Sequence, residues 1–136
     1  MTEPRRLADS FVHLGLGATA VPQPPFDGMA WYEAYGERHG ADGREGRLVS
    51  EYGFTEDWDS WEMHPAGDEL VICTAGALVL FQEYPDGHTE KVRIAAGEYA
   101  INPPGVWHTA DVDTTGGAEA RAIFITAGEG TQHRPR

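Results

Sequence analysis

The sequence predicts an all-β protein, either a small barrel or a sandwich. Short apolar, β-rich segments recur through the middle of the chain, and clusters of Gly, Pro, Asn and Asp separate them at regular intervals. That spacing is typical of barrels and sandwiches. No segment combines a helical period with a recognisable helix cap. At 136 residues the chain is long enough for one domain with its own core.

The individual strands follow from the turns between them. Residues 85–87, Pro-Asp-Gly, are a strong hairpin signal between two apolar segments. Residues 95–97 and 114–117 have turn composition and delimit the later strands. The expected strands are residues 48–55, 58–64, 69–74, 77–84, 88–94, 98–102, 107–112 and 118–126.

The two ends of the chain lack the regular pattern of strands and turns that the middle has. An extended linker at residues 22–28 is followed by an aromatic segment, residues 29–35, which we expect to be a strand or a short arm. Residues 36–46 are polar and glycine-rich and predict a loop. The expected organisation is an N-terminal arm and loop (1–47) that packs on the barrel or on a dimer partner, a barrel (48–126), and a frayed tail (127–136).

Composition limits the partners and the compartment. A formal net charge of −12 would repel the phosphates of nucleic acid and of anionic membrane surfaces, so neither is an expected partner. The single cysteine, Cys73, excludes an internal disulfide and lies in an apolar strand as a reduced core residue. Arg5 and Arg6 precede an apolar stretch, but Asp9 and His13 interrupt it, so we expect a cytoplasmic protein without a signal peptide.

Two glutamates and two histidines lie at spacings suited to one metal centre. Side chains alternate along a strand, so Glu62 and His64 share a face. A turn follows, and Glu69 begins the returning strand, where its carboxylate can face that pair. His108 begins a later strand after a rigid Pro-Pro-Gly turn. Imidazole and carboxylate are the usual ligands of Zn²⁺, Fe²⁺, Mn²⁺ and Ni²⁺, so these four residues are the predicted ligands of one such ion.

The same residues resemble the two motifs of the cupin superfamily. The first motif, G-x5-H-x-H-x(3,4)-E-x6-G, is matched by Glu62-x-His64-x4-Glu69-x6-Gly76. The second, G-x5-P-x-G-x2-H-x3-N, is matched by Gly97-x5-Pro103-x-Gly105-x2-His108-x3-Val112. The resemblance implies a double-stranded β-helix, or jelly-roll barrel, around one small-ligand cavity. It also implies a homodimer, for which the aromatic segment at residues 29–35 is the candidate contact.

The chain departs from the family pattern at the ligands themselves. Glu62 stands where the first motif has a histidine, Val112 replaces the closing asparagine, and the leading glycine has no clear match. Three arrangements therefore remain open: a four-ligand site with two carboxylates, a site of His64, Glu69 and His108 alone, or no metal site. In the second arrangement Glu62 would orient a histidine.

Several other polar residues could also belong to the site. Asp68 could replace Glu69, but the spacing to Gly76 favours Glu69. Arg121 is the one charge in an apolar strand and is a candidate for binding an anionic substrate, although a rim position is the simpler interpretation. The remaining histidines lack partners at ligand spacing and are expected at the surface; they are His13, His39, His88 and His133.

Three functions are compatible with this pattern. The first is a metal-dependent enzyme acting on a small polar metabolite, which within the family would resemble a dioxygenase, an isomerase or a lyase/cyclase. The second is a non-catalytic module that binds or senses a small ligand, since a fold does not fix chemistry. The third is a metal-free cupin in which a pocket histidine is a general base.

Overall fold

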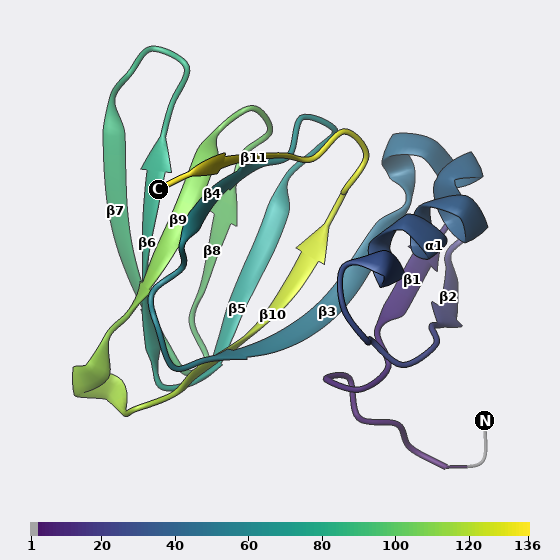
Figure 1. Ribbon diagram of the computed structural model, residues 1–136, viewed down its shortest axis with the longest axis horizontal. Helices are drawn as coiled ribbons and strands as arrows, with labels where there is room; N and C mark the ends of the chain where they lie inside the picture. Colours follow the sequence, from purple (N-terminus) through teal and green to yellow (C-terminus); the bar gives the residue numbers. More distant parts are fainter. Residues whose placement is uncertain (1–2) are drawn as a thin grey trace.

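A computed structural model describes residues 3–136 and has two antiparallel sheets (Figure 1). In the six-stranded sheet the order is β2 (Thr19–Pro22), β1 (Val12–Gly15), β3 (Arg47–Phe54), β10 (Ala120–Thr126), β5 (Glu69–Ala75) and β8 (Tyr99–Asn102). In the five-stranded sheet it is β11 (Gln132–Pro135), β4 (Ser60–Met63), β9 (Trp107–Val112), β6 (Ala77–Glu83) and β7 (Thr89–Ala95). The all-β prediction is confirmed, and each of the eight expected strands is present with ends within two residues of those predicted.

The main core lies between the two sheets. Its buried residues come from β5 and β10 of one sheet and from β6, β7 and β9 of the other. Cys73, on β5, is fully buried among them as a free thiol, as the sequence predicts. Alternation along β5 is regular, because Glu69, Val71 and Cys73 point inward while the residues between them are only partly buried. The inward face of β5 therefore carries both core residues and a site carboxylate.

The N-terminal segment is more regular than expected. Residues 30–39 form a helix, α1 (Ala30–His39), where a strand or arm followed by a loop was predicted, and a short 3₁₀ helix, η1 (Gly40–Glu45), follows it. The prediction was wrong because the helix has no side-chain N-cap and its stability comes from tertiary contacts. Trp31 is buried and packs edge-to-face on Phe11 with ring centroids 5.3 Å apart.

This segment packs on the barrel of its own chain. Strand β1 pairs with β3 and with β2, so the six-stranded sheet continues into the N-terminal region. Phe11, Trp31 and Leu48 form a second buried cluster, against which Tyr52 of β3 packs. Figure 1 shows β1, β2 and α1 together at one end of the molecule.

The C-terminal residues form a strand instead of a frayed tail. Strand β11 pairs with β4, with His133 opposite Glu62 and Arg134 opposite Trp61. The Arg134 guanidinium lies 5.0 Å from the ring centroid of Trp61 and 4.6 Å from that of Trp107, and it also pairs with Glu83. Such cation–π contacts, together with the backbone ladder, explain the order of this segment. Across residues 3–136, no helix combines the length and apolar character that a membrane crossing requires.

Candidate metal centre

The four predicted ligands lie together, although they come from both sheets. Glu62 is on β4, and His64 follows the end of that strand. Glu69 is the first residue of β5, and His108 is the second residue of β9, directly opposite Glu62 in the β4–β9 pairing. The turn between β4 and β5 therefore places the ligands of the first motif beside His108, the ligand of the second motif on β9.

The Glu69 carboxylate lies between the two imidazoles. Its Oε2 is 3.1 Å from His64 Nε2, and its Oε1 is 3.2 Å from His108 Nε2. Glu62 is slightly farther away, with Oε2 3.8 Å from His64 Nε2 and 3.9 Å from His108 Nε2. The alternative ligand Asp68 is adjacent in sequence to Glu69 but exposed, whereas Glu69 is buried. Ligand atoms of Glu62, His64 and His108 thus lie within 4.8 Å of one another, and the two oxygens of Glu69 each contact one of the histidines.

The two histidine nitrogens that face this point are buried and lack hydrogen bonds. His64 is 5% exposed, Glu69 3% and His108 0%. Neither His64 Nε2 nor His108 Nε2 has a hydrogen-bond partner within the described chain, since the contacts with Glu69 are close in distance but poorly aligned. A buried polar atom without a partner costs about 1–3 kcal/mol, so such a pair needs an explanation.

The opposite ring nitrogens fix the tautomers. Thr131 donates its hydroxyl proton to the Gly128 carbonyl, so its oxygen accepts from His64 Nδ1, 2.8 Å away. His108 Nδ1 faces the Val106 carbonyl at 3.4 Å, which can only accept. With a metal bound, the proton of each neutral ring would lie on Nδ1 and the lone pair on Nε2 would face the ion, as in metal-binding histidines.

A hydrogen-bond network holds the Glu69 carboxylate. Asn102 Nδ2 donates to Oε1 at 3.0 Å, and the Thr126 hydroxyl donates to Oε2 at 2.7 Å. Gln82 Nε2 donates in turn to Asn102 Oδ1 at 2.8 Å. Burial by itself raises the pKa of Glu69, but the adjacent His108 and His64 outweigh it and hold the pKa well below its usual range. The carboxylate is therefore ionised.

The same electrostatics act on His64 in the opposite direction. Burial lowers the pKa of its imidazole, whereas Glu69 and then Glu62 raise it, and the net shift is upward. The two acids thus create a site that favours positive charge. A divalent cation would satisfy that preference and leave both histidines neutral.

The geometry fits a metal ion. Two imidazoles that bind one tetrahedral ion at about 2.0–2.1 Å have ring centroids about 5 Å apart. The centroids of His64 and His108 are 5.1 Å apart. Carboxylate and imidazole donors suit Zn²⁺, Fe²⁺, Mn²⁺ or Ni²⁺. Glu62, His64 and His108 each offer a ligand atom within 4.8 Å of the others, and Glu69 lies between the two histidines.

Sequence reasoning missed the residues that support this site. His133 was expected to be a surface residue; it is half exposed, but its Nε2 lies 3.3 Å from Glu62 Oε1. Asn102 and Thr126 lie directly opposite Glu69 on the neighbouring strands, and Thr131 lies in the loop before β11. Each of these residues is far from its partner in sequence. Only knowledge of which strands pair, and in which register, could have identified them.

The site opens on a cavity of about 760 Å³. Its wall includes the aromatic side chains of Phe54, Trp58 and Phe124 from the barrel, together with several acidic residues such as Asp57 and Asp59. Helix α1 contributes Tyr32, whose hydroxyl hydrogen-bonds that of Tyr52 on β3. Burial raises the pKa of both phenols, so they remain protonated at neutral pH.

Arg121 does not take part in this site. It is not among the described residues that line the cavity. Its guanidinium instead pairs with Glu51 at 3.0 Å and with Glu119 at 2.8 Å. The substrate-binding role considered for Arg121 has no support in this arrangement, which agrees with the simpler rim interpretation.

The fold matches solved structures of cupins. An oxalate oxidase in complex with glycolate has a TM-score of 0.54 at 17% identity, over 63% of this chain and 45% of that chain. An oxalate decarboxylase has a TM-score of 0.52 at 14% identity, over 66% of this chain and 23% of that chain. Hydroquinone 1,2-dioxygenase from Sphingomonas sp. TTNP3 has a TM-score of 0.51 at 12% identity, over 59% and 58%.

These matches confirm the predicted jelly-roll fold and the resemblance to cupins. At such low identities they show the fold alone, and the match spans less than half of the oxalate oxidase chain. No protein-family model and no curated protein matches the sequence.

Proposed function

We propose that this protein is a metal-dependent enzyme of the cupin type that acts on a small molecule in the barrel cavity. The observation that carries the proposal is the pair of buried, unpartnered Nε2 atoms of His64 and His108 on either side of the ionised Glu69, where His64 and Glu69 line the cavity. Those three residues and Glu62 would hold one Zn, Fe, Mn or Ni ion. Such an ion supplies Lewis acidity or, if it is iron, O₂ chemistry.

Glu62 suits the role of a fourth ligand. With two carboxylates and two neutral imidazoles, the site would carry a charge of −2, which matches a divalent ion. Glu62 is also the most exposed of the four, with a side chain 31% exposed, and His133 contacts its other oxygen. We expect Glu62 to bind less tightly than Glu69 and to be the ligand nearest to an incoming substrate.

The cavity wall supports a substrate with an apolar body and a polar group. The polar group would face the metal ligands, while the body packs against the aromatic side chains of Phe54, Trp58 and Phe124. Fold neighbours include an oxidase, a decarboxylase and a dioxygenase, so oxidation of such compounds by O₂ is the first reaction to test. Isomerase and lyase/cyclase reactions remain in the proposed range.

The first experiment is elemental analysis of untagged protein. We expect about one divalent ion per chain, lost in His64→Ala and in His108→Ala but retained in His88→Ala, a matched histidine that is half exposed and pairs with Asp86 and Glu90. Absence of metal after incubation with Fe²⁺, Mn²⁺, Ni²⁺ and Zn²⁺ in turn would refute the proposal.

A second experiment separates catalysis from binding. O₂ consumption by the Fe²⁺-loaded protein with aromatic diols or thiols would support a dioxygenase. If a metal is present, such compounds quench tryptophan fluorescence without turnover, and Trp58→Phe removes that quenching, the non-catalytic binding function is favoured. The wall position of Trp58 makes it a suitable reporter.

We also propose that the protein forms a homodimer. The sequence offers residues 29–35 as the contact, but Trp31 of that segment is buried against Phe11 of its own chain. We propose strand β8 instead, because it is the edge of the six-stranded sheet and exposes Tyr99 (64%) and Ile101 (49%), which a second chain could cover. Light scattering would test this. A monomer mass at micromolar concentration would refute it.

A further inference from the structure

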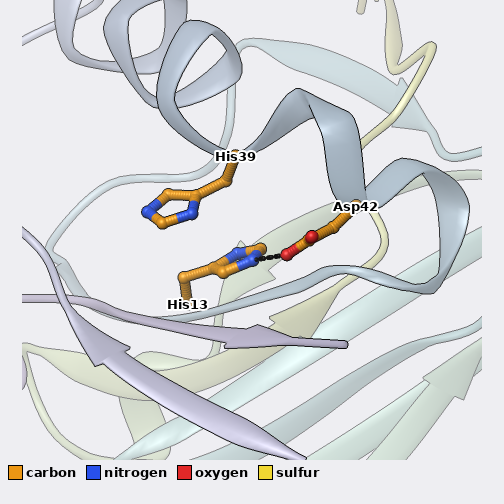
Figure 2. Close-up of side chains that lie close together, drawn as sticks. All are labelled: His13, His39 and Asp42. Carbon is orange, nitrogen blue, oxygen red and sulfur yellow. Dashed lines mark hydrogen bonds and ion pairs between the residues drawn. The ribbon is translucent and has the colours of Figure 1, made fainter. Parts of the chain in front are cut away.

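A second polar cluster lies in the N-terminal region, away from the proposed metal ligands. His13, on β1, is only 2% exposed, although the sequence suggested a surface residue. Its Nε2 is 2.6 Å from Asp42 Oδ2, and its Nδ1 is 2.6 Å from the Tyr35 hydroxyl. Figure 2 shows Asp42 reaching the edge of the His13 ring while His39 lies over its face.

The direction of the hydrogen bonds follows from the donors and acceptors. We assign the Asp42 carboxylate oxygen as the acceptor and His13 Nε2 as the donor of this hydrogen bond. Nδ1 of the neutral ring is then an acceptor, and the Tyr35 hydroxyl donates to it. The resulting order, hydroxyl to imidazole to carboxylate, is the arrangement that activates a hydroxyl group in hydrolytic triads.

The second imidazole of the cluster, His39, has a lowered pKa. Its imidazole stacks on His13 with centroids 4.0 Å apart and planes at 18°. Burial lowers the pKa of His39, and so do His13 and Arg38. Gln23 accepts from Arg38 through Oε1 and therefore presents its amide nitrogen to His39 Nε2, 2.9 Å away. These causes favour the neutral form of His39, and His13 is the ring that contacts Asp42.

The arrangement differs from that of the proposed metal ligands. Both nitrogens of His13 already have partners at 2.6 Å, whereas His64 Nε2 and His108 Nε2 have none. The stacked rings of His13 and His39 are also too close for two imidazoles on one ion, for which about 5 Å is expected. The cluster is better described as a hydrogen-bonded relay.

The chain leaves room for this pair by having glycine on both sides. A Cβ at Gly46 would lie 3.0 Å from His13 Cε1 and 3.1 Å from Asp42 Cβ. A Cβ at Gly15 would lie 2.8 Å from Asp42 Oδ2 and 3.2 Å from His13 Nε2. Larger residues at either position would push the imidazole and the carboxylate apart.

The relay faces the cavity that also contains the metal ligands. His13, Tyr35 and His39 line it, together with His64 and Glu69. We propose that Tyr35, His13 and Asp42 form a second acid–base site, in which the Tyr35 oxygen exchanges a proton with a hydroxyl-bearing molecule in the cavity. The Tyr35 proton passes to His13 Nδ1, the phenolate oxygen accepts the ligand's proton, and Asp42 stabilises the imidazolium.

Tyr35 needs this assistance. Burial and then Asp42 raise the pKa of its phenol to about 12, so the hydroxyl is protonated at neutral pH. Without a base in contact, its oxygen would be a poor proton acceptor. With neutral His13 in contact, a proton can leave as another arrives.

Reaction with benzenesulfonyl fluoride, followed by peptide mass spectrometry, tests the proposal without knowledge of the substrate. The Tyr35 oxygen bonds to sulfur, fluoride leaves, and His13 takes the phenol proton. We expect Tyr35 to react at least about tenfold faster than Tyr99, which is exposed and serves as the internal control. Equal rates would overturn the proposal.

The variant Asp42→Asn tests the relay. An asparagine amide can donate to Nε2, which would move the His13 proton to Nδ1 and reverse the bond to Tyr35. We expect the rate at Tyr35 to fall about tenfold or more while that at Tyr99 is unchanged. An unchanged rate at Tyr35 in a folded variant would refute the acid–base role and leave the cluster with a structural role alone.

Two further measurements keep the test decisive. In the wild type the pH dependence of the Tyr35 rate should differ from that of Tyr99, because the imidazole of His13 takes the phenol proton; a profile that follows Tyr99 would overturn the proposal even if Asp42→Asn does not fold. Zinc binding by a His64→Ala/His108→Ala double variant that is lost on His13→Gln would show a metal site instead. Labelling of that double variant separates this inference from failure of the metal proposal.

Discussion

Replacing Glu69 by glutamine should abolish most of the stabilisation by metal while changing the shape of the site little. The substitution removes a buried negative charge that lies 3.1 Å from His64 Nε2 and 3.2 Å from His108 Nε2. The amide oxygen can still accept from Asn102, and the Thr126 hydroxyl can rotate to accept from the amide nitrogen. We therefore expect the metal-free variant to fold with a stability close to that of the wild type.

The size of the effect follows from linkage. Free metal at 100 times the Kd stabilises the wild type by about 2.7 kcal/mol. For a domain of this size, about 3 °C of Tm corresponds to 1 kcal/mol, so metal should raise Tm by about 8 °C. Loss of a ligand weakens binding at least about 100-fold, since loss of a mere supporting contact costs 10–100-fold. The same metal concentration then equals the Kd and gives about 0.4 kcal/mol, or about 1 °C.

Differential scanning calorimetry of dialysed protein, with and without added Mn²⁺ or Zn²⁺, measures both quantities. The matched control is Glu90→Gln, which removes the same charge from a half-exposed position on β7. This control should keep the full metal-dependent rise in Tm. If Glu69→Gln also keeps it, or if both variants lose it equally, the assignment of Glu69 as a ligand is wrong.

Three further predictions concern the framework of the site. Gly76→Ala should lower the free energy of unfolding in urea by more than about 2 kcal/mol, because φ is +65° and the new Cβ would lie 2.3 Å from the Glu119 carbonyl oxygen. The control Gly87→Ala, at φ +90° with open space around it, should lower it by only about 1 kcal/mol. Equal losses of stability in the two variants would contradict the clash. Arg134→Ala should increase amide hydrogen exchange in β11 while β5 stays protected, because the substitution removes two cation–π contacts of about 0.5–1 kcal/mol each. Unchanged exchange in β11 would refute the stabilising role of Arg134. The wild type should lose stability as pH rises from about 10 to about 12, because unfolded Tyr35 releases its proton near 10 and folded Tyr35 near 12. Tyr35→Phe should make this slope shallower, with Tyr32 and Tyr52 keeping part of it, and an identical slope would count against the raised pKa of Tyr35.

The sequence carries most of the information about the barrel. Hairpin signals such as Pro85-Asp86-Gly87 act over a few residues, so the ends of the strands could be predicted closely. The candidate ligands could also be named in advance, because the spacing within each motif is set by one strand or one turn. Their role as metal ligands stays a prediction until metal is measured.

The ends of the chain could not be predicted in the same way. Helix α1 lacks a side-chain cap, and strand β11 is polar, so neither carries a strong local signal. Both are stabilised by partners far along the chain, such as Phe11 for Trp31 and the two tryptophans for Arg134. Local propensity is weaker than such contacts, so tertiary packing decided these elements.

By itself, the sequence determined which residues could bind a metal and which strands would carry them. Only the tertiary structure decided what surrounds those residues. Strand pairing places Asn102 and Thr126 against Glu69 across gaps of 33 and 57 positions, and folding of the N-terminal segment joins His13 to Asp42 across 29. Periodicity reports which face of a strand a residue lies on, but not which strand becomes its neighbour. That choice is made by burial of the shared core, which is why the relay at Tyr35 could be seen only in the folded chain.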